Sequence, residues 1–199
     1  MTMEIPTDAG EFILSLCVDS HGMIISGDSR GAVKVWNPAT GQLIRVMPLG
    51  HTFNNDAVRL FAIIGQNSTV TSLALDQNGL VVSAFDGTIK VWDTLNGVCK
   101  ATLNGLNTRI CRICSLIGGG FATGHDDGKI MRWTLSAASS SAATGGGDDG
   151  SVSYECSKIL EGHASRVRSL CQLPDGRLVS ASEDWQIRVW NIDAGICLR

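Results

Sequence analysis

The sequence predicts an all-β protein, because one short strand pattern recurs four times along its 199 residues. Four of the five tryptophans end this pattern, and a turn signal precedes each copy, at 32–36, 88–92, 129–133 and 186–190. The intervals between these tryptophans are 56, 41 and 57 residues. A unit of about 41 residues with two insertions of about 15 explains all three intervals, and this period is typical of a β-propeller with four-stranded blades.

Composition excludes several other classes of protein. Apolar residues make up 44% of the chain and charged residues only 18%, which excludes a disordered chain and a highly charged coiled coil. The formal net charge of −3 provides no basic field, so we expect neither direct nucleic-acid binding nor membrane binding. Residues 1–10 lack the features of a signal peptide. We therefore expect a cytoplasmic protein, with a nuclear location left open.

Each unit divides into four strands, which we call a, b, c and d in chain order. A turn signal separates strands a and b in every unit, at 20–22, 77–79, 118–120 and 174–176. The expected order is an N-terminal extension at 1–11, then blades at approximately 12–49, 67–103, 108–160 and 164–199. Insertions are expected at 52–66 and 136–153. The second is rich in Ala, Ser and Gly and predicts a flexible loop, whereas the first either packs on the adjacent blade or meets a partner.

The fourth unit resembles a repeat of the WD-repeat (WD40) family. It contains Gly162-His163, the segment 178–184 and the segment 187–191, and the resemblance extends over roughly residues 12–199. Only Trp92-Asp93 carries the literal Trp-Asp pair. Because this family usually closes with about seven blades, the resemblance implies a portion of a longer propeller, closure by association, or a four-bladed ring.

The resemblance also implies a buried hydrogen-bond chain, the structural tetrad, that runs from Trp through Ser or Thr and His to Asp. Its purpose is to pair an indole N–H that would otherwise be buried without an acceptor. The matching positions are His163, Ser180, Asp184 and Trp190 in the fourth unit, Thr123, Asp127 and Trp133 in the third, Ser83, Asp86 and Trp92 in the second, and Trp36 in the first. Leu106 stands at the His position of the third unit, and Arg30 at the Asp position of the first. In the second unit the His is either His51 or replaced by Gln66.

The candidate chemical motifs favour structural roles. Six of the seven cysteines occupy repeat-equivalent places in strands a and d, so we expect small apolar fillers separated around a ring rather than a metal site. Cys111 and Cys114 have metal-ligand spacing, but side chains three apart on a strand point to opposite faces. Residues 124–129 lack the spacing of a phosphate-binding loop, and no nucleophile elbow occurs. We predict a non-enzymatic protein with no cofactor and no metal. The alternative is a hydrolytic or metal centre at His125, Asp126, Asp127 and Cys111.

Trp185 is unusual because its equivalents in the other three units are glycines. An aromatic side chain in the turn between strands b and c is either an exposed anchor for a partner or packs over a neighbouring turn or the insertion. The same rim is expected to carry Glu183, Arg166, Arg109, Asp126, Phe85, Arg30 and Asp28. Its mixed charge favours a protein or peptide partner.

The sequence therefore predicts a scaffold or adaptor that presents a composite propeller rim to partner proteins or peptides. One alternative is a substrate receptor of a ubiquitin ligase, although the segment after Trp92-Asp93 lacks the supporting arginine two residues on. Another is a structural subunit of a signalling, trafficking or RNA-processing assembly. Open blade edges also predict possible self-association.

Overall fold

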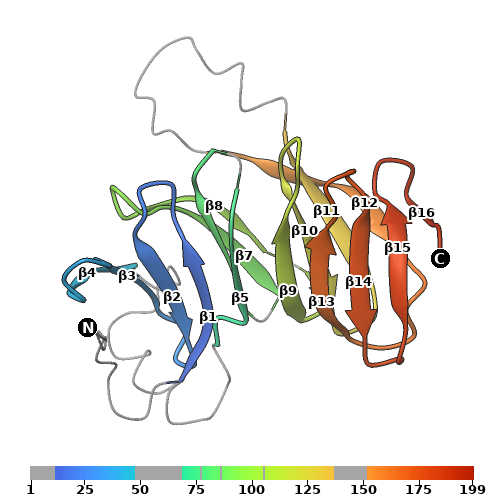
Figure 1. Cartoon of the computed structure of the whole chain (residues 1–199), viewed down its shortest axis with the longest axis horizontal. Helices are drawn as coiled ribbons and strands as arrows, with labels where there is room; N and C mark the ends of the chain where they lie inside the picture. Colours follow the sequence, from blue (N-terminus) through green and yellow to red (C-terminus); the bar gives the residue numbers. More distant parts are fainter. Residues whose placement is uncertain (1–11, 48–68, 77, 86, 105, 137–151) are drawn as a thin grey trace.

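The computed structural model describes residues 12–47, 69–76, 78–85, 87–104, 106–136 and 152–199. The described residues form sixteen strands in four antiparallel sheets of four, with no helix among them (Figure 1). None of the segments that the structure describes is a helix long and apolar enough to cross a bilayer. The predicted extension 1–11 and insertion 52–66 lie outside these residues, as does 137–151 of the second insertion.

Each sheet is one blade, and its strands lie in chain order. The first two blades contain β1 (Ile13–Val18), β2 (Ile24–Asp28), β3 (Val33–Trp36) and β4 (Leu43–Met47), then β5 (Ser72–Leu75), β6 (Val81–Phe85), β7 (Thr88–Asp93) and β8 (Val98–Leu103). The last two contain β9 (Ile110–Ser115), β10 (Phe121–His125), β11 (Ile130–Leu135) and β12 (Tyr154–Leu160), then β13 (Val167–Gln172), β14 (Leu178–Ser182), β15 (Ile187–Asn191) and β16 (Ile196–Cys197). The tight turns allow this order, because adjacent antiparallel strands need only a short connection.

The blades stand side by side, with their a strands innermost. Strand β1 contacts β5, β5 contacts β9, and β9 contacts β13. The first and fourth blades lie at opposite ends of the row, so the four sheets do not close into a ring (Figure 1). The outer faces of these two blades expose apolar side chains, among them Leu14, Leu16 and Val18 on β1 and Ile187 and Ile196 on the fourth blade.

Three apolar clusters hold adjacent blades together, one in each gap. Close approach requires a small residue on strand b. A Cβ atom built on Gly27 would lie 2.4 Å from Val70 Cγ1, and one built on Gly124 would lie 2.6 Å from Val167 Cγ1. These two glycines therefore let Val70, two residues before β5, and Val167, the first residue of β13, pack directly on the backbone of strand b.

At the end of the blades that holds the turns between strands a and b, hydrogen bonds add polar contacts between neighbouring blades. The Thr94 hydroxyl donates to Asp19 Oδ2 at 2.7 Å, which joins the first two blades. The Tyr154 hydroxyl donates to Asp76 Oδ2 at 2.5 Å, which joins the second and third. Burial and this carboxylate raise the pKa of Tyr154, so the phenol keeps the proton that it donates.

Candidate partner-binding surface

The four repeated tryptophans all donate their indole N–H to a hydroxyl on strand b. The Nε1 to Oγ distances are 2.8 Å for Trp36–Ser26, Trp92–Ser83 and Trp190–Ser180, and 2.9 Å for Trp133–Thr123. All four indoles are buried. The bond forms locally, because strands b and c are consecutive and antiparallel, so the hydroxyl and the indole lie on the same face of one hairpin.

The fourth blade extends this bond into a four-residue chain. Ser180 Oγ lies 2.7 Å from His163 Nε2, and His163 Nδ1 lies 2.7 Å from Asp184 Oδ2. An ionised carboxylate only accepts, so Nδ1 donates to Asp184 and, in the neutral ring, Nε2 accepts from Ser180. Although burial opposes ionisation, hydrogen bonds from His163 and from the amides of Ala164 and Gln186 lower the pKa of Asp184 to about 2.

The third blade completes its chain with a histidine that the sequence analysis assigned elsewhere. His125 Nε2 lies 2.8 Å from Thr123 Oγ1, and His125 Nδ1 lies 2.8 Å from the Thr108 hydroxyl. The assignment of Asp127 to this chain is wrong, since its carboxylate accepts the amide of Lys129 in the turn between strands b and c. The spacing could have identified His125, because Thr123 and His125 are two residues apart on one strand and therefore share a face.

His125 is fully buried, and both of its ring nitrogens have a hydroxyl partner. Burial lowers its pKa, against the opposing charges of Asp127 and Asp126, so the ring is neutral in this setting. The ring is not accessible to solvent in this structure. Within the described parts of the chain, no three His, Cys, Asp or Glu side chains are grouped so as to hold a metal ion.

The first blade replaces histidine with a buried ion pair. Lys34 Nζ lies 3.4 Å from Asp28 Oδ2, and Asp28 also accepts the amides of Arg30 and Ala32 at 2.9 and 2.8 Å. The prediction that Asp28 lies on the exposed rim is therefore wrong, because this side chain is 0% exposed. In the second blade, Lys90 Nζ lies 5.5 Å from the ring of Trp92. The predicted Asp86 lies outside the described residues.

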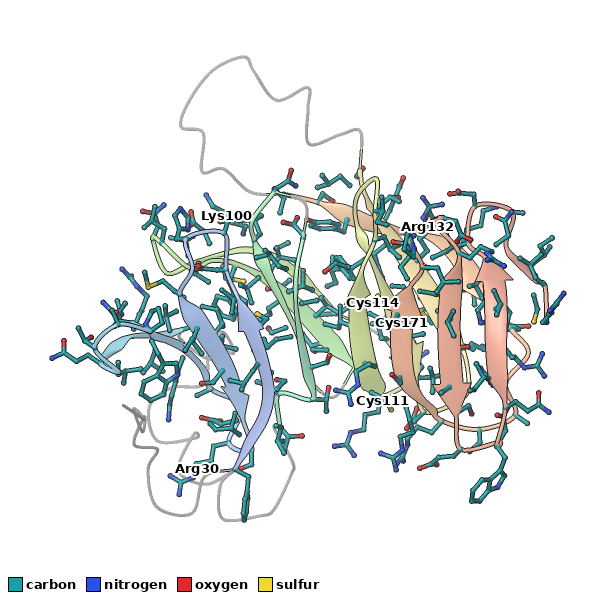
Figure 2. The ribbon with its side chains drawn as sticks, viewed as in Figure 1. Arg30, Lys100, Cys111, Cys114, Arg132 and Cys171 are labelled. Carbon is teal, nitrogen blue, oxygen red and sulfur yellow. The ribbon has the colours of Figure 1, made fainter. Side chains whose placement is uncertain are left out.

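The cysteines occupy the predicted register, but their surroundings differ from expectation. Cys99, Cys156 and Cys197 each pair with the tryptophan of their blade, as repeat-equivalent residues should. Cys17, Cys99 and Cys114 pack against apolar clusters, whereas Cys156, Cys171 and Cys197 are exposed. Cys114 and Cys171 lie on adjoining inner strands rather than far apart, and burial, together with Cys171, raises the pKa of Cys114 (Figure 2). Inner strands of neighbouring blades converge, which the expectation of separation overlooked.

Trp185 projects from the turn between β14 and β15 with 98% of its surface exposed. Its φ angle is +66°, which makes it the one non-glycine residue with positive φ in the described part of the chain. The equivalent Gly31, Gly87 and Gly128 have φ angles of +85°, +79° and +86°. The turn thus requires a left-handed residue, and an L residue with a side chain is strained there. The indole is not packed over the neighbouring turns that the structure describes.

The other rim residues gather near this turn to different degrees. Glu183 forms ion pairs with Arg168 and, at 4.0 Å, with Arg166. Asp126 accepts the amide of Arg109 at 3.1 Å in the third blade. Arg30 is exposed at the lower end of the first blade, on the same side of the molecule as Cys111, and the side chain of Phe85 is outside the described part (Figure 2). Arg112 and Arg168 also lie near this rim and were not predicted from the sequence, although the spacing of Arg166 and Arg168 places both on one face of strand a.

Comparison with known proteins agrees with this geometry. The family model described as WD domain, G-beta repeat matches residues 58–93 and 154–191. The chain is 25% identical over 90% of its length to the DENN domain and WD repeat-containing protein SCD1 of Arabidopsis thaliana. It is 26% identical over 78% of its length to mitochondrial division protein 1 of Aspergillus terreus. It is 28% identical over 58% of its length to the target of rapamycin complex subunit wat1 of Schizosaccharomyces pombe.

The aligned regions make up 16%, 26% and 32% of these three relatives, so the chain spans between about a sixth and a third of their length. The two matched segments are WD40 repeats, and the four-stranded blades with their tryptophan–hydroxyl hairpins support a β-propeller architecture whose described sheets do not close.

Proposed function

We propose that this chain is a non-enzymatic scaffold that binds partner proteins through the turns between strands b and c, which lie at the lower end of its blades in Figure 1. WD40 repeats are in general interaction modules, and the rigid tryptophan hairpins here hold the turns of several blades in one fixed surface. In this proposal the chain binds its partners without catalysing a reaction. Binding depends on the arrangement of side chains that belong to different repeats.

The observation that carries this proposal is the conformation of Trp185. A left-handed backbone disfavours any side chain with a Cβ, and an indole exposed to water gains no packing that would offset the strain. Exposed aromatic residues are frequent hot spots of protein interfaces, because they bury a large apolar area with few rotatable bonds. A partner that covers Trp185 supplies the missing packing.

One relative bears on the kind of partner. The protein wat1 is named as a subunit of the target of rapamycin complex. A role as a fixed subunit of a larger assembly is therefore a second form of the same proposal, and the exposed apolar faces of the first and fourth blades favour it.

The test compares proteins captured from cell extract by the full chain and by Trp185→Ala, quantified by mass spectrometry. The matched control is Ile117→Ala, which removes an apolar side chain that is 67% exposed at the opposite end of the blades. We expect Trp185→Ala to lose a defined set of proteins that the control retains. Equal recovery of that set by both variants would contradict the proposal.

A further inference from the structure

A cavity opens at the lower end of the inner strands and has a volume of about 340 Å³. Its wall includes Leu14 from the first blade and Thr69 from the segment that leads into the second. The charged residues of the wall are four arginines from the third and fourth blades, namely Arg109, Arg112, Arg166 and Arg168. All four blades therefore contribute to this arginine cavity, as expected of a composite surface at the centre of a propeller.

The arginine cavity has more positive charge than its neighbours neutralise. Glu183 is the carboxylate that pairs with both Arg166 and Arg168. Arg109 donates to the neutral hydroxyl of Thr69 at 3.4 Å, and Arg112 donates from Nε to the carbonyl of Arg168 at 3.2 Å. Among the residues that the structure describes, no carboxylate forms an ion pair with Arg109 or Arg112. An anion that enters the cavity thus meets two guanidinium groups whose charge is not yet paired.

Two further observations indicate that the guanidinium groups converge. The Nε atom of Arg166 is buried and has no hydrogen-bond partner in the described structure. Burial raises the pKa of the Cys111 thiol; the positive charge of Arg166 opposes this rise, the Asp126 carboxylate adds to it, and Arg109 and Arg168 oppose it, so three arginines and one carboxylate act on this sulfur. Cys111 lies at the lower end of β9, at the cavity (Figure 2).

We propose that the arginine cavity binds an anionic side chain of a partner peptide, either a carboxylate or a phosphate group. Guanidinium groups present paired donors that match both kinds of oxyanion, and Leu14 offers an apolar contact for a neighbouring residue of the peptide. This proposal rests on the scaffold function proposed above and names the chemistry of the partner.

The turn that carries Trp185 is connected to one wall of the cavity. The amide of Glu183, two residues before Trp185, donates to the carbonyl of Arg166 at 3.0 Å. This backbone hydrogen bond joins the turn that carries Trp185 to the segment that carries Arg166. A nucleic acid fits less well, because the described residues that line the cavity include no aromatic side chain on which a base could stack.

The experiment measures binding of the full chain to three labelled libraries of short peptides by fluorescence anisotropy. The libraries have random flanking residues and a central phosphoserine, glutamate or serine. We expect the phosphoserine or glutamate library to bind about tenfold more tightly than the serine library at low salt, and binding to weaken as salt is added. Comparison of the phosphoserine and glutamate libraries shows which anion the cavity prefers. A labelled single-stranded RNA of random sequence is measured in parallel.

The double variant Arg109→Gln, Arg112→Gln should lose about tenfold in affinity for the anionic library. The control is Arg177→Gln, which removes an exposed arginine paired with Asp175 at the opposite end of the fourth blade and should bind normally. Circular dichroism verifies that both variants are folded. Equal binding of the serine library, equal losses in both variants, or binding of the RNA in place of peptides would overturn the proposal.

The two proposals can fail separately. If Trp185→Ala loses its protein partners while anionic and neutral peptides bind alike, the anion site is wrong and the scaffold stands. If anionic peptides bind in an arginine-dependent way while Trp185→Ala keeps every partner, the cavity is a ligand site and the Trp185 surface is wrong.

Discussion

Single residues in this protein hold conformations that have a local energetic cost. Trp185 adopts φ of +66° without packing around its indole, and an L residue in the left-handed region costs about 1–2 kcal/mol. His125 is the opposite case, because a titratable side chain is fully buried and its burial lowers the pKa of the ring. The effect of each residue can be measured in the isolated chain, on the free energy of unfolding for Trp185 and on the pH dependence of that free energy for His125.

Replacement of Trp185 should separate backbone strain from binding. We expect Trp185→Gly to raise the free energy of unfolding by about 1 kcal/mol, because glycine adopts positive φ without steric cost. Trp185→Ala keeps a Cβ atom and should show little gain, although both variants lose the indole. Urea unfolding of the three proteins measures this difference, and a Gly variant less stable than the Ala variant would refute the strain argument.

His125 should make stability depend on pH just below neutrality. Its pKa is lowered from 6.5 by burial, so the unfolded state binds a proton more readily than the folded state. The free energy of unfolding is then highest above pH 6.5 and falls as the pH drops below that value. We expect His125→Gln, which cannot titrate, to flatten this slope, as measured by urea unfolding at a series of pH values. An unchanged slope in the variant would assign the pH dependence to other groups.

At the scale of the elements, stability depends on how closely strand b of one blade approaches the inner strand of the next. The side chains of Val70 and Val167 fill the space beside Gly27 and Gly124. The corresponding residues in the other two blades are Ala84 and Ala181, which are also small. Such contacts are sensitive to added volume, because protein interiors are close-packed.

Gly124→Val should separate the third and fourth blades. Its Cβ alone would lie 2.6 Å from Val167 Cγ1, so the blades must shift, and overpacking of this kind costs about 1–3 kcal/mol. Gly124→Ala should cost less, since the second blade has Ala84 at this place. Urea unfolding midpoints of the two variants give the comparison. Equal midpoints for Gly124→Val and the unaltered chain would show that the blades do not meet as described.

At the scale of the whole molecule, the row of four blades leaves apolar sheet faces exposed at both ends (Figure 1). Large exposed apolar patches favour association. The chain therefore gains stability from anything that covers these faces, whether further blades, a partner subunit or a second copy.

We expect the isolated chain to associate as its concentration rises, and Leu16→Glu to reduce this association. Leu16 is 64% exposed on the outer face of β1, so a charge there opposes burial against another chain. Ile117→Glu is the control, because Ile117 is equally apolar and 67% exposed but lies in a turn between strands a and b. Light scattering over a range of concentrations reports the mass. A constant monomer mass for the unaltered chain would contradict the prediction.

The sequence by itself determined the strands, the four blades and the pairing of three of the four tryptophans with a hydroxyl; Ser26, the partner of Trp36, was not predicted. These features form within single hairpins, where Ser180 and Trp190 are only ten residues apart and turn residues set the register. Only the tertiary structure decided which group completes each buried chain. His125 serves in the third blade because its partner Thr108 comes from the loop before strand a, and Asp28 turns inward because Lys34 lies buried beside it. The arginine cavity joins segments from four blades, and contacts between residues so distant in sequence depend on how the blades pack, which no local pattern encodes.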